Sequence, residues 1–312
     1  MIPWPKPQEE FLFQKLQSWN EIIIKDSNNL LLIDEKGPHL KKGFFFPPEM
    51  NPCEFQRECE EFCAQRDQKW NFSSPYVSFC VPFNNENLRY TFIHESLTAN
   101  KKSQVHIRRL QAKKLSLSDF SLSKDEEKII KEIILKGENI LICGGTGDGK
   151  TSFLQTLLHQ LPSEENNLIL EDTQELSSKE TSWSHLVSSG QKEKTLYDLC
   201  HYALRMSPKR IILGEIRSKE VIPLLFLASS GHAGIMSTIH AKNAQEAISR
   251  LSFLYLTEQE HPSFNYEQAV SLVASQIQFV ITIKEKKVKE MAKVIGHHQG
   301  KVYLEEQIIK NS

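Results

Sequence analysis

Residues 144–151, GGTGDGKT, restrict the possible folds of this chain more than any other part of the sequence. They fit the pattern G-x-x-x-x-G-K-[ST], between an apolar run at 139–143 and a helix expected at 151–161. In such a unit, glycines let backbone N–H groups turn inward around a phosphate, and the helix points its positive end at the same anion. A plain glycine turn would not explain the lysine and threonine that close the motif. The motif therefore predicts a loop that binds ATP or GTP.

Single residues of this loop have expected roles. Lys150 should reach the β- and γ-phosphates, and the Thr151 hydroxyl should bind Mg²⁺. Asp148 is unusual, because a carboxylate beside phosphates is unfavourable unless it points to solvent. The residues expected to contact the nucleotide from this segment are Gly144, Gly145, Thr146, Gly147, Asp148, Gly149, Lys150, Thr151 and Ser152.

Short apolar runs alternate with helical patterns after a capping box at Ser123–Glu126. Such alternation predicts an α/β fold with a mostly parallel sheet covered by helices on both faces. Beyond it, residues 278–306 contain β-like runs with a turn at 296–300. Strands are expected at 139–143, 168–170, 210–213 and 235–239, and helices at 151–161, 195–206, 219–229 and 244–256.

The first part of the chain has a different pattern and predicts a smaller N-terminal α/β domain. Helices are expected at 10–19 and from Asn51–Pro52 to about Arg66, and strands at 22–24, 30–33, 76–83, 88–93 and 104–108. Residues 111–122 are rich in Lys, Ser and Leu and have no clear period. We therefore expect an N-terminal domain at 1–110, a linker at 111–123 and the ATPase domain at 124–312.

Composition restricts the partners. Lys plus Arg (38) nearly equals Asp plus Glu (39), so a net charge of -1 provides little attraction for a polyanion and disfavours nucleic acid as the main partner. The first seven residues contain three prolines and no apolar core of a signal peptide, and the longest apolar stretch, 221–236, is too polar to span a bilayer. A cytoplasmic location is expected. The six cysteines include no Cys-x-x-Cys pair, which favours free thiols over a metal site.

Acidic residues follow two of the expected strands. A P-loop needs a carboxylate at the end of a neighbouring strand to hold Mg²⁺ or to orient water. Glu215 follows the run at 210–213, and Glu171 and Glu175 follow the run at 168–170. Glu215 and Glu171 are candidate catalytic residues, and Glu171 and Glu175 are candidate Mg²⁺ ligands with Thr151. Solvated acids at strand ends are common, so the alternative for any one of them is an ordinary loop residue.

Two histidines bracket the strand expected at 235–239, and His240 would lie at the same edge of the sheet as Glu215. The phosphate loop, the acidic box 171–175, the Gly214-Glu215 segment and the histidine box 231–241 occur in an order that resembles the type II/type IV secretion and pilus ATPases. The segment 203–208, ALRMSP, and the His240-Ala241 ending look like the type IV secretion ring ATPases and the Flp/Tad pilus ATPases. Asp148, Lys209 and Lys242 depart from the common pattern of the family.

The resemblance implies a homohexameric ring at the cytoplasmic face of an inner-membrane secretion or pilus complex. Each subunit would have a RecA-like P-loop NTPase core behind its N-terminal domain. It would hydrolyse ATP with Mg²⁺, and the reaction would use Lys150, Glu215 and His240. In such proteins the N-terminal domain lends arginines to the phosphates, and Arg108 and Arg109 look like that segment. The alternative is that these two arginines are ordinary charges at a strand end.

Two other functions stay open from the sequence. The first is a nucleic-acid-translocating ring motor on the same RecA-like core, which the neutral net charge and the absence of an aromatic-plus-basic strip disfavour. The second is an ATP-dependent scaffold with weak hydrolysis, which Asp148 and Lys242 keep possible. The sequence does not identify the secretion or pilus system, its transported substrate or its membrane partner.

Overall fold

The computed structural model describes residues 19–309, apart from 27–28, 35–36, 43–51, 84–85, 111–114, 179, 189–193 and 260–263. The chain divides into two compact units, Met1–Ala112 and Lys113–Ser312. The helix expected at 10–19 lies outside the described residues, except for Trp19. Among the described residues, no helix is both long enough and apolar enough to cross a bilayer.

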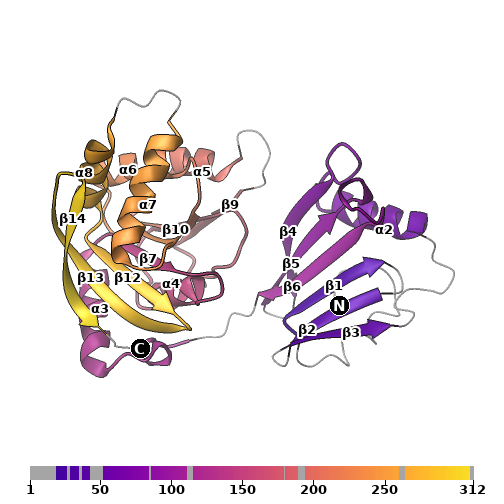
Figure 1. Ribbon diagram of the computed structural model, residues 1–312, viewed down its shortest axis with the longest axis horizontal. Helices are drawn as coiled ribbons and strands as arrows, with labels where there is room; N and C mark the ends of the chain where they lie inside the picture. Colours follow the sequence, from indigo (N-terminus) through magenta and orange to yellow (C-terminus); the bar gives the residue numbers. More distant parts are fainter. Residues whose placement is uncertain are drawn as a thin grey trace. The chain divides into compact units, whose positions relative to one another are not determined.

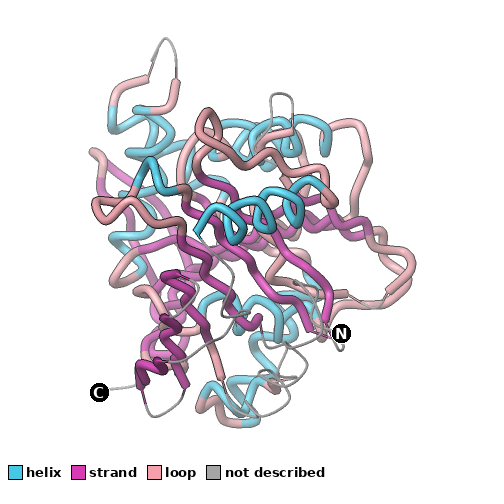
Figure 2. The backbone as a smooth tube through the Cα atoms, turned by 90° about the vertical axis from the view of Figure 1, so that its right-hand side faces the viewer, coloured by secondary structure: helices cyan, strands magenta, loops and turns pink. Residues whose placement is uncertain are grey.

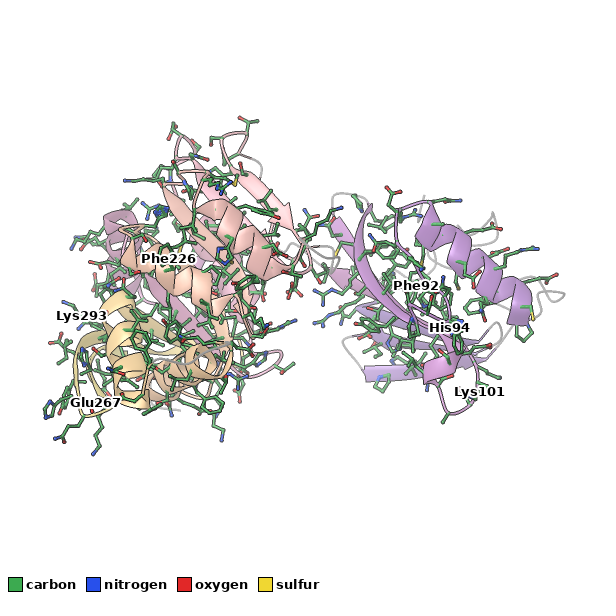
Figure 3. The ribbon with its side chains drawn as sticks, turned by 90° about the horizontal axis from the view of Figure 1, so that it is seen from above. Phe92, His94, Lys101, Phe226, Glu267 and Lys293 are labelled. Atoms are coloured by element: carbon green, nitrogen blue, oxygen red, sulfur yellow. The ribbon has the colours of Figure 1, made fainter. Side chains whose placement is uncertain are left out.

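The first unit contains a six-stranded antiparallel sheet with helix α2 (Pro52–Ala64) packed against it (Figure 1). Alternate residues of a strand face opposite sides, and in the fifth strand Leu88, Tyr90 and Phe92 are fully buried. The Phe62 ring of α2 lies 5.1 Å from the Tyr90 ring, and Phe92, labelled in Figure 3, belongs to the same core. In spatial order the strands are β3 (Gly37–Lys42), β2 (Asn29–Asp34), β1 (Glu21–Asp26), β6 (Gln104–Leu110), β5 (Glu86–Ile93) and β4 (Tyr76–Phe83), and the short helix η1 (Glu95–Leu97) follows β5.

The second unit contains an eight-stranded sheet in the order β14-β13-β12-β7-β11-β10-β8-β9. The strands from β12 to β9 run parallel to their neighbours, and β13 and β14 are antiparallel. This mostly parallel sheet confirms the expected fold class. The strands are β7 (Ile140–Gly144), β8 (Asn167–Glu171), β9 (Ser184–Val187), β10 (Arg210–Ile216), β11 (Met236–His240), β12 (Phe279–Lys284), β13 (Lys287–His298) and β14 (Lys301–Ile309).

Helices cover both faces of this sheet (Figure 2). Leu141 and Cys143 of β7 belong to one hydrophobic core, with α5 (Leu196–Ala203), α6 (Val221–Ser229), α7 (Ala244–Thr257) and α8 (Tyr266–Gln276). Ile140 and Ile142 belong to the other core, with α3 (Lys124–Lys136) and α4 (Lys150–Leu158). Both faces are therefore apolar, which explains the uninterrupted apolar runs of these strands.

The segment expected as a linker is partly folded into the second unit. Helix η2 (Leu117–Phe120) buries Leu117 and Phe120, and Leu122 follows them into the same core. The Phe120 ring lies 4.9 Å from the ring of Phe153 on α4. Residues 117–122 therefore pack on the face of the sheet that α3 and α4 cover.

The parallel order brings the predicted site segments to one edge of the sheet. Neighbouring parallel strands end at the same edge, and β7, β11, β10 and β8 are neighbours in that order. The phosphate loop follows β7, His240 ends β11, and Glu171 ends β8. Glu215 lies one residue before the end of β10. Ligands of open α/β sheets bind at this edge.

Candidate active site

The phosphate loop leads from the buried strand β7 directly into α4. Gly149 is the N-cap of α4 and has a φ of 97°, a left-handed conformation that glycine adopts without a steric penalty. The first turn of the helix then presents Lys150, Thr151 and Ser152. Thr151 is half-buried and Ser152 is exposed, as are Gly145, Thr146 and Gly147 of the loop. The start of α4 and the exposed loop lie where the predicted contacts with a phosphate would be made, and anion binding there stays a prediction.

Lys150 is held at the base of the loop. Its side chain is 7% exposed, and its Nζ donates to the carbonyl oxygens of Gly145 (2.9 Å) and Gly144 (3.2 Å). The same Nζ lies 3.3 Å from Nδ1 of His240. Burial lowers the pKa of Lys150, and the negative charges of Glu215 and Asp148 oppose that shift. The ammonium group is therefore positioned beside the strand edge where a phosphate would bind.

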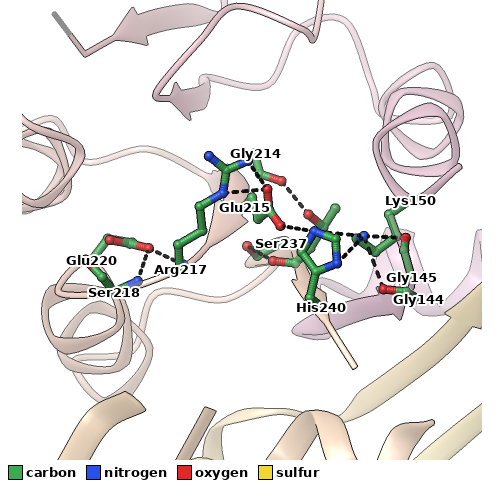
Figure 4. Close-up of polar contacts among 11 residues, drawn as sticks. Gly144, Gly145, Lys150, Gly214, Glu215, Arg217, Ser218, Glu220, Ser237 and His240 are labelled. Carbon is green, nitrogen blue, oxygen red and sulfur yellow. Dashed lines mark hydrogen bonds and ion pairs between the residues drawn. The ribbon is translucent and has the colours of Figure 1, made fainter. Parts of the chain in front are cut away.

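Glu215 connects His240 to Arg217 (Figure 4). Its Oε1 lies 2.8 Å from Nε2 of His240, and its Oε2 accepts hydrogen bonds from the guanidinium of Arg217, with 2.7 Å to Nε. Nε2 of His240 also lies 3.5 Å from Nζ of Lys150, so the imidazole is placed between a cation and a carboxylate. The structure thus brings together Lys150, His240 and Glu215, three of the residues predicted to be catalytic, and their catalytic role stays a prediction.

Backbone contacts fix the position of Glu215. The register between β10 and β11 shifts between Leu213 and Ile216, and the Thr238 hydroxyl donates to the carbonyl oxygen of Gly214 at 2.7 Å. After the strand, the buried Glu220 carboxylate accepts hydrogen bonds from the backbone N–H groups of Arg217 and Ser218. These contacts hold the chain on both sides of Glu215, so its carboxylate has a defined direction.

Glu171 is bonded differently from the role expected for it. Its carboxylate is 3% exposed, and it accepts hydrogen bonds from the backbone N–H groups of Glu175 and Leu176. His185 of β9 completes the set with Nε2 at 2.7 Å from Glu171 Oε2. Both oxygens are used within the protein, so in this structure Glu171 holds the 172–177 loop and β9 to β8. No local pattern in the sequence points to His185.

Mg²⁺ binding by Thr151, Glu171 and Glu175 stays a prediction. Within the described part of the chain, no three or more His, Cys, Asp or Glu residues are grouped as a metal site. Glu175 is exposed, and Glu171 is committed to N–H donors. Thr151, in the first turn of α4, fits an Mg²⁺ ion, because this ion usually binds one or two protein ligands together with phosphate oxygens and water.

The first unit separates the two predicted phosphate-binding arginines. Arg108 is exposed on β6 and is paired in register with Arg89 of β5 and Glu21 of β1. Arg109, the next residue, points to the opposite face of the sheet, where its guanidinium lies 5.8 Å from the Trp19 ring centroid. Contact of either residue with a nucleotide stays a prediction.

The stability of the second unit should depend on the protonation of His240. Burial and the charge of Lys150 lower the pKa of His240 from 6.5, and Glu215 opposes the shift. A histidine whose pKa is lower in the folded state binds more protons when unfolded, so the free energy of unfolding decreases as pH falls below 6.5. Urea denaturation between about pH 7 and about pH 5.5 should therefore show a larger loss for the wild type than for His240→Gln. His201→Gln, which changes an exposed histidine of α5, is the control, and equal losses for all three proteins would contradict the expectation.

The fold and the site together define a P-loop nucleotide-binding protein. The chain belongs to the family described as Type II/IV secretion system protein, whose model matches residues 78–303. This confirms the family resemblance of the sequence motifs.

Curated relatives come from type IV secretion and conjugation. The type IV secretion system protein PtlH of Bordetella pertussis is 31% identical over 166 residues, which cover 51% of this chain and 49% of PtlH. Protein VirB11 of Agrobacterium fabrum is 30% identical over 164 residues, which cover 51% of this chain and 48% of VirB11. A Mycobacterium tuberculosis protein named for conjugal transfer is 36% identical over 131 residues, which cover 40% of this chain and 37% of that protein. The chain thus matches half or less of the length of these relatives.

Solved structures share the fold. The pilus retraction motor PilT with bound ADP superimposes with a TM-score of 0.68 and 17% identity, covering 99% of this chain and 84% of PilT. The ATPase DotB of Legionella pneumophila gives a TM-score of 0.66 and 18% identity, covering 98% of this chain and 82% of DotB. At such identities the likeness establishes the architecture, a P-loop core with an N-terminal domain.

Proposed function

We propose that this chain is an ATP-hydrolysing motor subunit that powers a bacterial type IV secretion or pilus-assembly machine. The observation that carries the proposal is the convergence of Lys150, His240 and Glu215 beside the phosphate loop at the carboxyl edge of the sheet. Membership in the secretion family and the names of the relatives support the type of machine. The proposal includes a location of the protein at the cytoplasmic face of an inner-membrane complex.

The bound substrate would be held by the loop and the start of α4. The N–H groups of this segment would surround the β-phosphate, and Lys150 would exchange its contacts with the Gly144 and Gly145 carbonyls for the β- and γ-phosphate oxygens. The Thr151 hydroxyl would hold Mg²⁺, which when bound neutralises part of the phosphate charge. Each of these contacts becomes stronger in the transition state if it lies where charge increases on the oxygens.

Glu215 is the proposed base for the attacking water. Its carboxylate would accept a proton as the water oxygen bonds to the γ-phosphorus and the bond to the bridging oxygen of ADP breaks. Arg217 holds Oε2, so Oε1 is the oxygen left to face His240 and the reaction. The neutral imidazole of His240 lies between Glu215 and Lys150. A shift of Lys150 on γ-phosphate binding or release would therefore move His240 and, with it, the end of β11.

Assembly tests this proposal. A motor that applies force needs neighbours arranged head to tail, and a heterologous contact that closes produces a ring. We expect hexamers in the presence of Mg²⁺ and a non-hydrolysable ATP analogue, and a turnover per subunit that rises with protein concentration. Mass photometry and steady-state phosphate release measure both, with nucleotide-free protein as the control. A monomer with full activity per subunit at micromolar concentration would instead indicate a solitary P-loop enzyme.

A further inference from the structure

Asp148 of the phosphate loop does not point freely into solvent. Its Oδ2 accepts a hydrogen bond from the backbone N–H of Gly145 at 2.6 Å, and its Oδ1 accepts one from the N–H of Glu285 at 3.1 Å. Its own carbonyl oxygen accepts a third hydrogen bond, from the N–H of Lys286 at 2.9 Å. One loop residue therefore connects the phosphate loop to a segment 137 residues further along the chain.

The segment that Asp148 contacts is the turn between β12 and β13. Lys284 pairs with Lys287, so Glu285 and Lys286 are the two residues of a tight hairpin turn, with φ angles of 53° and 60°. Two positive φ angles are typical of a type I′ turn, whose central N–H groups point away from the strand ladder. Both of these N–H groups donate to Asp148, which satisfies two donors that the hairpin itself leaves unused.

The contact requires a carboxylate in this place. Each of the two oxygens accepts a separate N–H group, one from the loop itself and one from the turn. An asparagine could accept only one of them, and its amide nitrogen would face the other N–H group, donor against donor. Glycine at position 145 leaves room for this carboxylate. Any other residue there would place its Cβ only 2.9 Å from Asp148 Oδ2.

We propose that Asp148 is a positioning residue for nucleotide binding. Its carboxylate ties the phosphate loop to the β12–β13 turn and keeps the loop in the observed conformation before ATP binds. The inference rests on the proposed function for its ligand, ATP. Two effects of the side chain oppose each other, since a carboxylate repels phosphates while an ordered loop binds them with a smaller entropy cost. Because Asp148 holds the loop to the β12–β13 turn, we expect the gain from the ordered loop to exceed the repulsion between the carboxylate and the phosphates.

Removal of the carboxylate should weaken ATP binding. Asp148→Ala should raise the Kd and the KM for ATP about tenfold, the effect of about 1.4 kcal/mol, and should lower kcat at saturating ATP much less. Asp148→Asn, which keeps one acceptor oxygen but sets its amide N–H₂ group against the other N–H donor, should also raise both constants. Hydrogen exchange of nucleotide-free protein should become faster in both variants at the Gly145 and Glu285 amides. Titration calorimetry, steady-state kinetics and exchange mass spectrometry measure these three effects.

The matched control is the pair Glu138→Ala and Glu138→Gln. These variants remove a carboxylate of the same unit just before β7, at the edge of the sheet opposite the phosphate loop, so ATP affinity should equal that of the wild type. Unchanged or tighter binding by Asp148→Ala and Asp148→Asn would overturn the proposal, as would unchanged exchange at Glu285. If the wild type itself bound no ATP, the proposed function would fail, and the exchange comparison would still decide whether Asp148 holds the loop to the turn.

Discussion

A Lys150→Ala variant is expected to lose ATP hydrolysis by at least about a hundredfold, because preorganised donors at developing phosphate charge contribute about 10²–10³ each to the rate. The fold should survive, since alanine favours the first turn of a helix and the exposed Gly145 carbonyl can bind water in place of the ammonium group. Phosphate release in the presence of Mg²⁺ measures the loss, and circular dichroism with thermal unfolding measures the fold.

Lys209→Ala is the matched control for this variant. Lys209 is an exposed lysine of the same unit, next to the start of β10 and away from the carboxyl edge of the sheet. Wild-type turnover of Lys209→Ala together with inactive, folded Lys150→Ala would support the phosphate-loop assignment. Normal turnover by Lys150→Ala would exclude it.

Most elements with a strong local pattern could be predicted from the sequence. The run at 76–83 is β4, and the helix expected to start at Asn51–Pro52 is α2. In the second unit, β7, β8, β10 and β11 lie at the expected apolar runs because strands covered on both faces need uninterrupted apolar residues. A mostly parallel sheet could be predicted, but the order of its strands could not, since strand order depends on tertiary packing.

One α-helix and two strands were not predicted, for different reasons. Helix α8 carries a usable signal, a reciprocal cap between Asn265 and Gln268 followed by buried residues at helical spacing. Strand β3 contains Pro38, His39 and two lysines, so it has no strand pattern of its own, and it forms by pairing with β2. Strand β9 has four residues and pairs with β8 alone, so no local pattern distinguishes it from a loop.

The proximity of site residues could be predicted where each residue belongs to a motif at the end of a strand. Lys150, Glu215 and His240 each come directly from a motif and a neighbouring parallel strand. The bonding of Glu171 depends on His185, fourteen residues away, and that of Asp148 depends on a turn 137 residues away. Such long-range hydrogen bonds change the expected role of a carboxylate and leave no trace in local sequence.

A Glu215→Gln variant is expected to bind ATP with nearly wild-type affinity and to lose about 10²–10⁴ of its turnover, the usual contribution of a general base. Glutamine has the size of glutamate, and its amide oxygen can still accept a hydrogen bond from Arg217. It cannot take a proton from water, and it does not provide the negative charge beside His240. The variant should therefore accumulate in the ATP-bound state.

Single-turnover kinetics and calorimetry separate binding from chemistry in this variant. Glu138→Gln is the control, because it makes the same isosteric change just before β7, at the opposite edge of the same sheet, and should retain wild-type turnover. Trapped, unhydrolysed ATP on a folded Glu215→Gln protein would support the role of base. If the variant instead released ATP, or unfolded at a much lower temperature than the wild type, the link from His240 through Glu215 to Arg217 would be structural, and another group would have to activate the water.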